Sequence, residues 1–365
     1  MAKLGEVCLL KAGKFVSAND ISPEYNKGLY PCFGGNGIRG YVADYTHDGE
    51  FPLIGRQGAL CGNVNLASGK FHATEHAVVV QPKIEMNVHW LYYALNAMNL
   101  GQYATGAAQP GLAVSKLETL SIEIPNISEQ NKIAQTLYKV EQLVNFRKQQ
   151  LAKLDELVKA RFVEMFGTFP ANPFRWSIGK IQDVVSDVRY GSSRPAVEGG
   201  KYPYLRMNNI TYSGELDLRD TKRIDIPDSE LDKCTVRRGD VLFNRTNSKE
   251  LVGKTCVYNR DELMVLAGFV IRVRINERIR PEVLSAFLNM DFSKRMLIGM
   301  CKTAIGQANI NAKELQNIDL YIPPIELQDQ FVTLKNKIDQ QKQTVQQSLE
   351  NLELLKKALM QEYFG

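Results

Sequence analysis

Two long stretches of the chain repeat hydrophobic residues at helical spacing. The first stretch, residues 128–165, contains neither glycine nor proline. Its apolar positions alternate at intervals of four and three residues, interrupted only at Arg147: Ile133, Leu137, Val140, Val144, Leu151, Leu154 and Val158. This spacing predicts one helix of about 36 residues that pairs with a second helix as a coiled coil. The alternative is an amphipathic helix packed on a globular domain, but the usual globular helix is several times shorter.

The second stretch follows residue 325 and has a seven-residue hydrophobic repeat: Phe331, Ile338, Val345, Leu352 and Leu359. The seam positions between these residues are mixed, because Leu349 is apolar but Lys335, Lys342 and Lys356 are charged. We expect this stretch to form the partner helix. If the two helices pack together, the second must run antiparallel to the first.

The rest of the sequence is typical of mixed, β-rich domains. Short β-branched runs, and alternating runs that end at proline, predict strands at residues 75–82, 121–125, 267–275 and 318–323. Glycine-rich turns such as 34–40 separate such runs. One short helix is expected in each domain, near 87–98 and near 281–290. The predicted fold class is α+β.

The chain repeats itself with an offset of 198 residues. The segment that begins at Thr105 aligns without a gap with the segment that begins at Thr303. Matched pairs include Gln109 with Gln307, Leu117 with Leu315, Pro125 with Pro323, Gln130 with Gln328 and Gly167 with Gly365. The repeat predicts a pseudo-two-fold protein of four parts: a domain at 1–125, a helix at 126–168, a second domain at 169–324 and a helix at 325–365. Two similar domains would then lie at opposite ends of the helix pair, turned about 180° from each other.

Charge is unevenly distributed between the two domains. Residues 1–125 hold 9 basic and 10 acidic side chains, whereas residues 169–324 hold 24 basic and 19 acidic ones. A basic surface favours nucleic acid as a partner, although solvated charge explains many such excesses.

Several classes of protein fit the sequence poorly. No apolar run approaches the roughly 20 residues that span a bilayer, and the N-terminus is a poor signal peptide, so the expected location is the cytoplasm. The six cysteines form no CxxC pair, which argues against a zinc ribbon or a thioredoxin-type site. We expect reduced, mostly structural thiols.

Across nearly its whole length the chain resembles the specificity (S) subunits of Type I restriction–modification systems. The resemblance rests on the duplicated T-x3-Q…L…IP…Q segment before each long helix, and on the strings FPLIGRQGALCGNV, KFHATEHAVVV and DVLFNRTNSKELVGKT. It implies two target recognition domains that each read half of a bipartite duplex DNA target. It further implies helices that dock two methyltransferase subunits, joined by restriction/translocase subunits. S-adenosylmethionine, ATP and Mg would be bound by those partners, and this chain would have no cofactor. A leading N-terminal helix of some relatives is expected to be absent or very short.

The candidate DNA-binding residues combine basic groups with amides, hydroxyls and flexible turns. Arginine can bind guanine or phosphate, asparagine can pair with adenine, and serine, threonine and lysine suit phosphates. The predicted set is Arg56, Gln57 and Gln109 in the first domain, and Arg189, Tyr190, Ser192, Ser193, Arg194, Arg206, Asn208, Asn209, Arg245, Thr246, Asn247, Lys249, Gln307 and Asn309 in the second. For each of them a solvated polar turn is the competing interpretation.

Catalytic motifs are weak by comparison. His72, Glu75 and His76 match an H-x-x-E-H zinc string, but that chemistry needs a helix and the string enters a predicted strand. The glycines at 34–37 are too few for a nucleotide loop, and Asn172-Pro173-Phe174 lacks the second proline of a methyltransferase tetrad. We therefore expect a non-catalytic subunit without a metal. The alternatives are the specificity subunit of a Type IIB-like enzyme, a two-domain protein scaffold, and a metal hydrolase.

Overall fold

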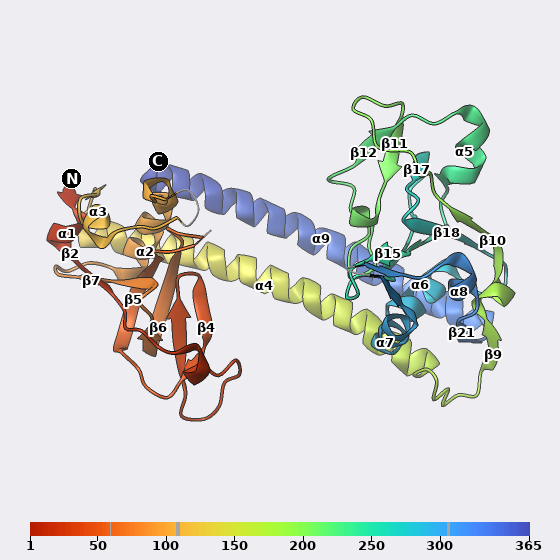
Figure 1. The fold of residues 1–365 in the computed structure, drawn as a ribbon, viewed down its shortest axis with the longest axis horizontal. Helices are drawn as coiled ribbons and strands as arrows, with labels where there is room; N and C mark the ends of the chain where they lie inside the picture. The colour runs from red at the N-terminus through yellow and green to blue at the C-terminus, as the bar shows by residue number, and fades with distance from the viewer. Residues whose placement is uncertain (59, 107–109, 305–306) are drawn as a thin grey trace. The chain divides into compact units, whose positions relative to one another are not determined.

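The computed structural model describes residues 1–58, 60–106, 110–304 and 307–365, without the side chains of 302–304 and 307. It separates into two compact units (Figure 1). Unit 1 comprises Met1–Lys148 with Gln347–Gly365, and unit 2 comprises Gln149–Gln346. Two helices of 40 residues each, α4 (Ile127–Phe166) and α9 (Ile325–Phe364), contribute one half to each unit. No described helix is both long enough and apolar enough to cross a membrane.

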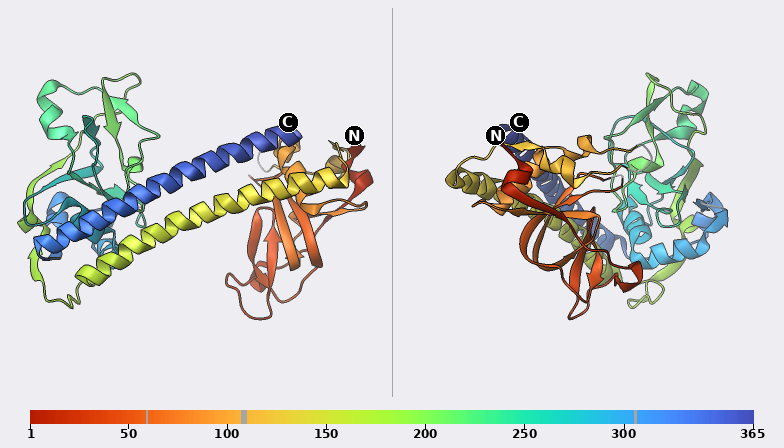
Figure 2. Two further views of the ribbon diagram at one scale, coloured as in Figure 1. Left: turned by 180° about the vertical axis from the view of Figure 1, so that it is seen from behind. Right: turned by 60° about the vertical axis from the view of Figure 1, so that its left-hand side comes forward.

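Unit 1 is built on a six-stranded sheet with the strand order β2-β7-β5-β6-β3-β4. Among the described strand pairs of this sheet, β3 and β6 are parallel and the other pairs are antiparallel. Its strands and helices are β1 (Ala2–Lys3), α1 (Leu4–Val7), β2 (Cys8–Ala12), β3 (Tyr30–Gly34), β4 (Gly37–Val42), β5 (His47–Gly55), β6 (Val64–Ala73), β7 (Ala77–Pro82), α2 (Val88–Ala97), α3 (Val114–Glu118) and β8 (Ser121–Ile122). A hydrophobic core joins Val78 of the sheet, Trp90 of α2 and Leu137 of α4. Figure 2 shows this sheet from two further sides, beside the first half of α4.

Unit 2 divides its strands among smaller sheets. One has the order β10-β18-β14-β16 and another the order β12-β11-β17-β13. Its strands are β9 (Ser177–Lys180), β10 (Val185–Tyr190), β11 (Tyr202–Leu205), β12 (Lys222–Ile224), β13 (Thr235–Val236), β14 (Val241–Asn244), β15 (Thr246–Asn247), β16 (Thr255–Val257), β17 (Met264–Leu266), β18 (Val270–Ile275), β19 (Lys302–Ala304), β20 (Gln307–Asn309) and β21 (Asp319–Ile322). Its shorter helices are α5 (Asp228–Cys234), α6 (Pro281–Asn289), α7 (Asp291–Met300) and α8 (Ala312–Gln316).

The two units share an equivalent backbone contact, in which the acceptors Leu120 and Ile318 lie 198 residues apart and the donors Leu4 and Ile181 lie 177 residues apart. Leu4 N–H donates to the Leu120 carbonyl at 2.8 Å in unit 1, and Ile181 N–H donates to the Ile318 carbonyl at 2.9 Å in unit 2. The short pair β1–β8 corresponds to the pair β9–β21. The repeated sequence therefore folds into a repeated structure.

Two buried glutamines hold the start of each long helix in the same way. Gln130 donates to the Pro125 carbonyl at 2.8 Å and accepts the Asn87 N–H at 2.9 Å. Gln328 donates to the Pro323 carbonyl at 2.8 Å and accepts the Arg280 N–H at 2.8 Å. Both side chains are almost fully buried, so each amide satisfies backbone groups that water cannot reach.

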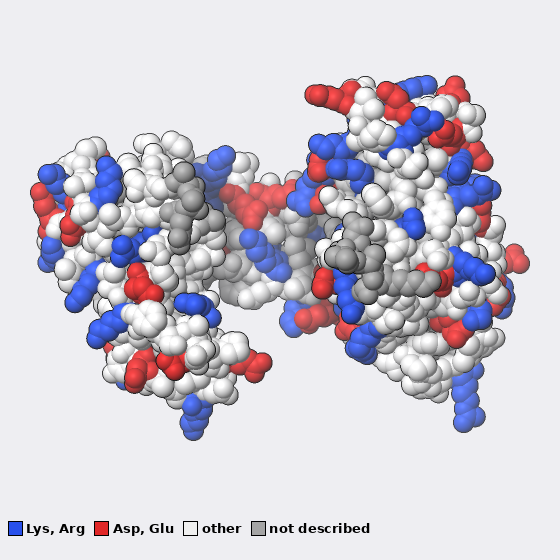
Figure 3. Space-filling view, in the orientation of Figure 1, with Lys and Arg blue, Asp and Glu red and all other residues white. Residues whose placement is uncertain are grey.

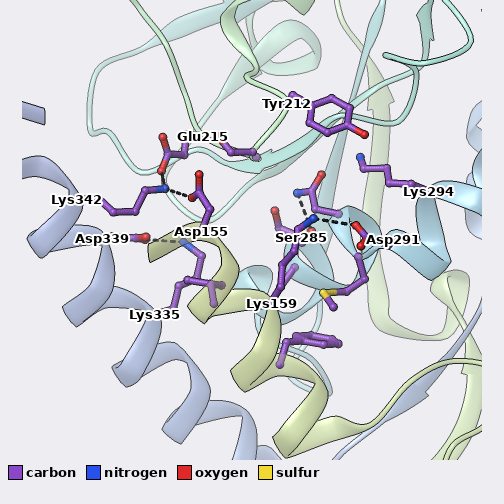
Figure 4. Close-up of a pocket in the computed structure, with 17 residues that line it drawn as sticks. Asp155, Lys159, Tyr212, Glu215, Ser285, Asp291, Lys294, Lys335, Asp339 and Lys342 are labelled. Atoms are coloured by element: carbon purple, nitrogen blue, oxygen red, sulfur yellow. Dashed lines mark hydrogen bonds and ion pairs between the residues drawn. The ribbon is translucent and has the colours of Figure 1, made fainter. Parts of the chain in front are cut away.

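Within each unit, α4 and α9 run antiparallel, and cross-helix contacts follow this direction. In unit 1, Arg147 Nε donates to Ser348 Oγ at 3.1 Å, and Lys356 pairs with Glu141 at 2.7 Å. In unit 2, Lys342 pairs with Asp155 at 2.5 Å and with Glu215. Figure 4 shows the Lys342 ammonium between these two carboxylates.

These pairings explain the charged positions in the seam. Burial by itself would lower the pKa of Lys342, but its hydrogen bonds to Asp155 and Glu215 raise that pKa above its ordinary value. The charge is therefore retained in a buried place because two carboxylates neutralise it. Apolar seam residues precede and follow Lys342 along α9, and Phe331, Ile338 and Val345 are all buried.

Candidate nucleic-acid interface

Three predicted residues that lie far apart in the sequence meet in unit 2. Arg245 follows β14, Tyr190 ends β10 and Asn309 ends β20. The Arg245 guanidinium lies 4.8 Å from the Tyr190 ring centroid and donates to Asn309 Oδ1 at 3.2 Å. Asn309 Nδ2 in turn donates to Thr246 Oγ1 at 2.8 Å. We call Tyr190, Arg245, Thr246 and Asn309 the unit 2 arginine cluster.

Local hydrogen bonds shape the loop that carries Arg245. Asn244, which is fully buried, donates to the Thr246 and Phe269 carbonyls at 3.1 and 3.2 Å. Asn247 Nδ2 donates to Asn244 Oδ1 at 3.0 Å, and Asn247 Oδ1 accepts the Ser248 N–H at 2.9 Å. The Asn247 side chain thus shapes this loop through its own hydrogen bonds, whereas Lys249 is exposed.

The two arginine candidates within residues 189–194 form ion pairs with carboxylates. Arg189 is exposed and pairs with Asp187 at 2.8 Å, and Asp187 also pairs with the buried Arg272 at 2.7 Å. Burial by itself would raise the pKa of Asp187, but hydrogen bonds from both arginines lower it. Arg194 pairs with Glu230 at 2.7 Å.

Of the two serines in the same turn, one is buried and the other is exposed. Ser192 is buried, its hydroxyl accepts the Arg194 N–H at 3.2 Å, and its carbonyl accepts the Tyr204 hydroxyl at 3.1 Å. Ser193 is exposed. Ser192 therefore serves the turn, and only Ser193 has a free surface.

A further group of candidates forms its own network. Asn209 is 1% exposed, accepts the Arg206 N–H at 2.8 Å and donates to the Asp217 carbonyl at 2.8 Å. Arg206 pairs with Asp220 at 2.9 Å. Asn208, between them, is exposed. Asn209 thus holds the 206–220 region together, and Asn208 is the member of this group that is open to a ligand.

Unit 1 presents Gln57 in a shallow cleft of about 440 Å³. The cleft is lined by Gly34, Gly35, Asn36, Arg39, Gln57, Leu60 and His76. Asn36 lies in the turn between β3 and β4, and Arg39 lies in β4; neither was among the predicted DNA-binding residues. Gln109 lies outside the described residues, and of Gln307 only the backbone, in β20, is described.

Arg56 and Arg245 occupy equivalent places in the two units. Arg56 N–H donates to the His76 carbonyl and its own carbonyl accepts the Leu112 N–H, at 3.0 and 2.9 Å. Arg245 N–H donates to the Phe269 carbonyl and its carbonyl accepts the Ile310 N–H, at the same two distances. Each arginine also has a buried Nε for which the described residues supply no acceptor. A buried donor without an acceptor is costly, which favours completion by a ligand.

The H-x-x-E-H string does not assemble a zinc face. His72 lies in β6, and its ring nitrogens are 3.3 and 3.2 Å from the Asp44 and Lys14 carbonyls. His76 lies in the following turn, where it pairs with Glu75 at 3.2 Å. The described residues contain no group of three or more potential ligands placed to hold a metal.

Basic and acidic side chains are interspersed on the face of the molecule in Figure 3, and several of the arginines of unit 2 are paired. Figure 3 shows one face, on which basic and acidic side chains alternate over unit 2. Arg194, Arg238 and Arg280 each pair with a carboxylate at 2.6–2.7 Å. The excess of basic residues in the second domain therefore forms no continuous patch on this face.

Comparisons with known proteins place the chain in one family. The sequence matches the Type I restriction modification DNA specificity domain over residues 1–156 and 175–354. It is 53% identical over 143 residues to the EcoprrI specificity subunit of Escherichia coli, covering 39% of this chain and 36% of that protein. It is 22% identical over 279 residues to the EcoKI specificity subunit of Escherichia coli K12, covering 72% and 60%. The chain thus spans less than two thirds of the length of either relative.

The fold agrees with this assignment. The crystal structure of the Type I restriction–modification S subunit from M. genitalium matches with a TM-score of 0.63 at 18% identity, covering 100% of this chain and 95% of that one. The match confirms the predicted α+β class, with two β-rich domains and two long antiparallel helices. Because the family match extends over most of the sequence and includes both repeats, we conclude that the chain belongs to the Type I restriction–modification DNA specificity family.

Proposed function

We propose that this chain is the DNA-specificity subunit of a Type I restriction–modification complex, in which each unit binds one half of a bipartite duplex target. The observation that carries the proposal is the equivalence of Arg56 and Arg245, with the same backbone bonds in each unit and a buried Nε for which the described residues supply no acceptor. A duplicated reader suits a target with two half-sites. Arginine is the residue best suited to fork onto guanine or phosphate.

Contacts in unit 2 divide the candidates by role. The unit 2 arginine cluster and the exposed Arg189, Ser193, Asn208 and Lys249 remain candidates for DNA contact. Ser192, Asn209 and Asn247 support these residues through their backbone bonds. Most of the exposed set is expected to hold phosphates, because most protein–DNA hydrogen bonds go to the DNA backbone.

The helices offer a surface for the protein partners of such a complex. In unit 1, α4 exposes Leu143 and Phe146, and α9 exposes Leu354 and Leu355. Contiguous exposed apolar surface marks protein interaction sites, and these four residues are the candidates for such a surface on the helices of unit 1. We propose that they dock the methyltransferase subunits, two in number, which restriction/translocase subunits then join. S-adenosylmethionine, ATP and Mg belong to those partners, and the complex acts in the cytoplasm.

The test is to express the chain with the methyltransferase encoded beside it and to map N6-methyladenine. We expect one interrupted motif in the presence of both proteins, and neither methylation nor cleavage by the purified chain. Duplex binding should weaken steeply with salt, since phosphate contacts release counterions. Methyl transfer by the chain alone, or a complex that methylates without a motif, would contradict the proposal.

A further inference from the structure

His76 in unit 1 and Phe269 in unit 2 occupy one equivalent position. Each carbonyl accepts the N–H of the equivalent arginine at 3.0 Å. Each residue directly precedes an inner strand of its sheet, β7 or β18. Gly13 N–H donates to the next carbonyl in unit 1, that of Ala77, and Gly191 N–H donates to the next carbonyl in unit 2, that of Val270. In the sequence, His76 stood out only as part of the H-x-x-E-H string, and Phe269 belonged to no candidate site.

Phe269 combines a fixed backbone with an exposed ring. Its carbonyl accepts hydrogen bonds from Arg245 N–H and from the buried Asn244 side chain. Gly268, beside it, donates to the Ser192 carbonyl at 2.7 Å. The side chain nevertheless remains 53% exposed and joins none of the hydrophobic clusters of the described residues. A ring that packs into no described hydrophobic cluster, beside the backbone of Arg245, is accessible to a ligand that binds at this place.

The same position carries different chemistry in unit 1. His76 faces the cleft that Gln57 and Asn36 line, and its ring pairs with Glu75. The backbone arrangement is thus common to both units while the side chain changes from polar to apolar. A protein whose two halves read different sequences needs such a position, with a fixed frame and a variable side chain.

We propose that Phe269 is a specificity-determining residue that contacts the 5-methyl group of a thymine in the second half-site, next to the base or phosphate that Arg245 binds. The inference rests on the proposed function. The thymine methyl is the apolar feature of the major-groove base edges, and a phenylalanine ring is a suitable contact for it. His76, being polar, would not select a methyl group at the corresponding place in the first half-site.

The test uses the full chain in complex with its methyltransferase and duplexes that carry the mapped motif. Each thymine of the second half-site is replaced in turn by uracil, which removes only the methyl group. We expect one replacement to weaken binding about fourfold in the wild-type complex, the effect of one buried methyl group. Phe269→Ala and Phe269→His should lose about this factor with the normal duplex and should not distinguish uracil from thymine at that place.

Two controls separate a base contact from other roles. The salt dependence of binding should be the same for Phe269→Ala and wild type, because a lost phenyl ring releases no counterion. Leu263→Ala, which truncates another half-exposed apolar residue of unit 2, should bind as wild type does.

The outcomes also separate this inference from the proposed function. If the wild-type complex recognises a motif but Phe269→Ala keeps the same response to every uracil, the inference is wrong and the proposed function stands. A loss of affinity with no thymine dependence would assign the ring to packing, and a second half-site without thymine would equally overturn the inference. A wild-type complex that recognises no motif would instead contradict the proposed function itself.

Discussion

The Arg245 guanidinium lies over the ring of Tyr190, 4.8 Å from its centroid, although 55 residues separate them in the chain. The pairing of β10 and β14 with the same strand, β18, brings them together. Tyr190 is itself held, because its hydroxyl accepts the Ala312 N–H at 2.8 Å. The arginine is thereby oriented before any ligand arrives, and such preorganisation lowers the entropic cost of binding.

The first prediction concerns this arginine. Arg245→Ala should weaken recognition of the second half-site by about 1–3 kcal/mol if the side chain reads a base. If it holds a phosphate instead, affinity should fall for all sequences and the salt slope should shrink. Titration of duplexes at several salt concentrations distinguishes the two roles. Lys313→Ala, in α8 of the same unit, is the control that also removes one positive charge. If Arg245→Ala leaves both the motif and the affinity unchanged, the loop has only a structural role.

The second prediction concerns the glutamine that holds α9. Gln328→Ala leaves the Arg280 N–H and the Pro323 carbonyl without their partner in a buried place. We expect unit 2 to lose about 1–3 kcal/mol of unfolding free energy, the usual cost of a buried unsatisfied group. Denaturant unfolding measures the loss, with the exposed Gln343→Ala as the control on the same helix. Equal stability of the two variants would show that the buried amide is dispensable.

The third prediction concerns Lys294, whose side chain lines the pocket in Figure 4. Burial, with the nearby charges of Lys159 and Lys254, lowers its pKa from 10.5 to about 7. The unfolded chain therefore holds a proton between pH 7 and 10.5 that the folded unit releases, so folding becomes more favourable as pH rises through this window. Below pH 7 Lys294 is charged in both the folded and the unfolded chain, so the full free-energy cost of burying the charge opposes folding.

Lys294→Met should remove this dependence. The variant also loses the hydrogen bond from Nζ to the Gly253 carbonyl, which destabilises it at every pH. The informative quantity is therefore how the difference in unfolding free energy between the variant and wild type changes with pH. We expect the stability of the variant relative to wild type to be highest near pH 6.5 and to fall toward pH 9.5. Unfolding curves at three pH values measure it. A difference that stays constant over this range would show that Lys294 keeps an ordinary pKa.

The fourth prediction treats the helices as a ruler. Four residues added to α4 after Val144, matched by four in α9 after Leu352, lengthen each helix by about 6 Å and turn it by about 400°, close to a full turn. Duplex DNA rises about 3.4 Å per base pair, so the unread spacer should grow by one or two base pairs while both half-sites stay unchanged. A two-residue insertion turns the helix by about 200° and should abolish activity. Motif mapping decides the matter, and an active four-residue mutant with the original spacer would mean that the helices do not set the gap.

Local patterns in the sequence determined the long helices and the repeat. The spacing of Leu137, Val140 and Val144 reflects the period of a helix, which depends only on neighbouring residues, and all three are buried as the pattern predicts. The match of Gln130 with Gln328 likewise pointed to a shared structure, since the same residue at the same offset makes the same bonds. The family resemblance drew on the same local strings.

Tertiary structure alone decided which polar residues face outward. Arg245, Tyr190 and Asn309 meet because strands far apart in sequence pair with one another, and no local pattern specifies such pairing. By contrast, Asn209 looked like a surface residue in a polar string, yet it is buried because the 206–220 segment folds back over it and its amide satisfies the backbone there. An amide or arginine can serve either a loop or a ligand, and only the folded chain determines which groups remain unpaired.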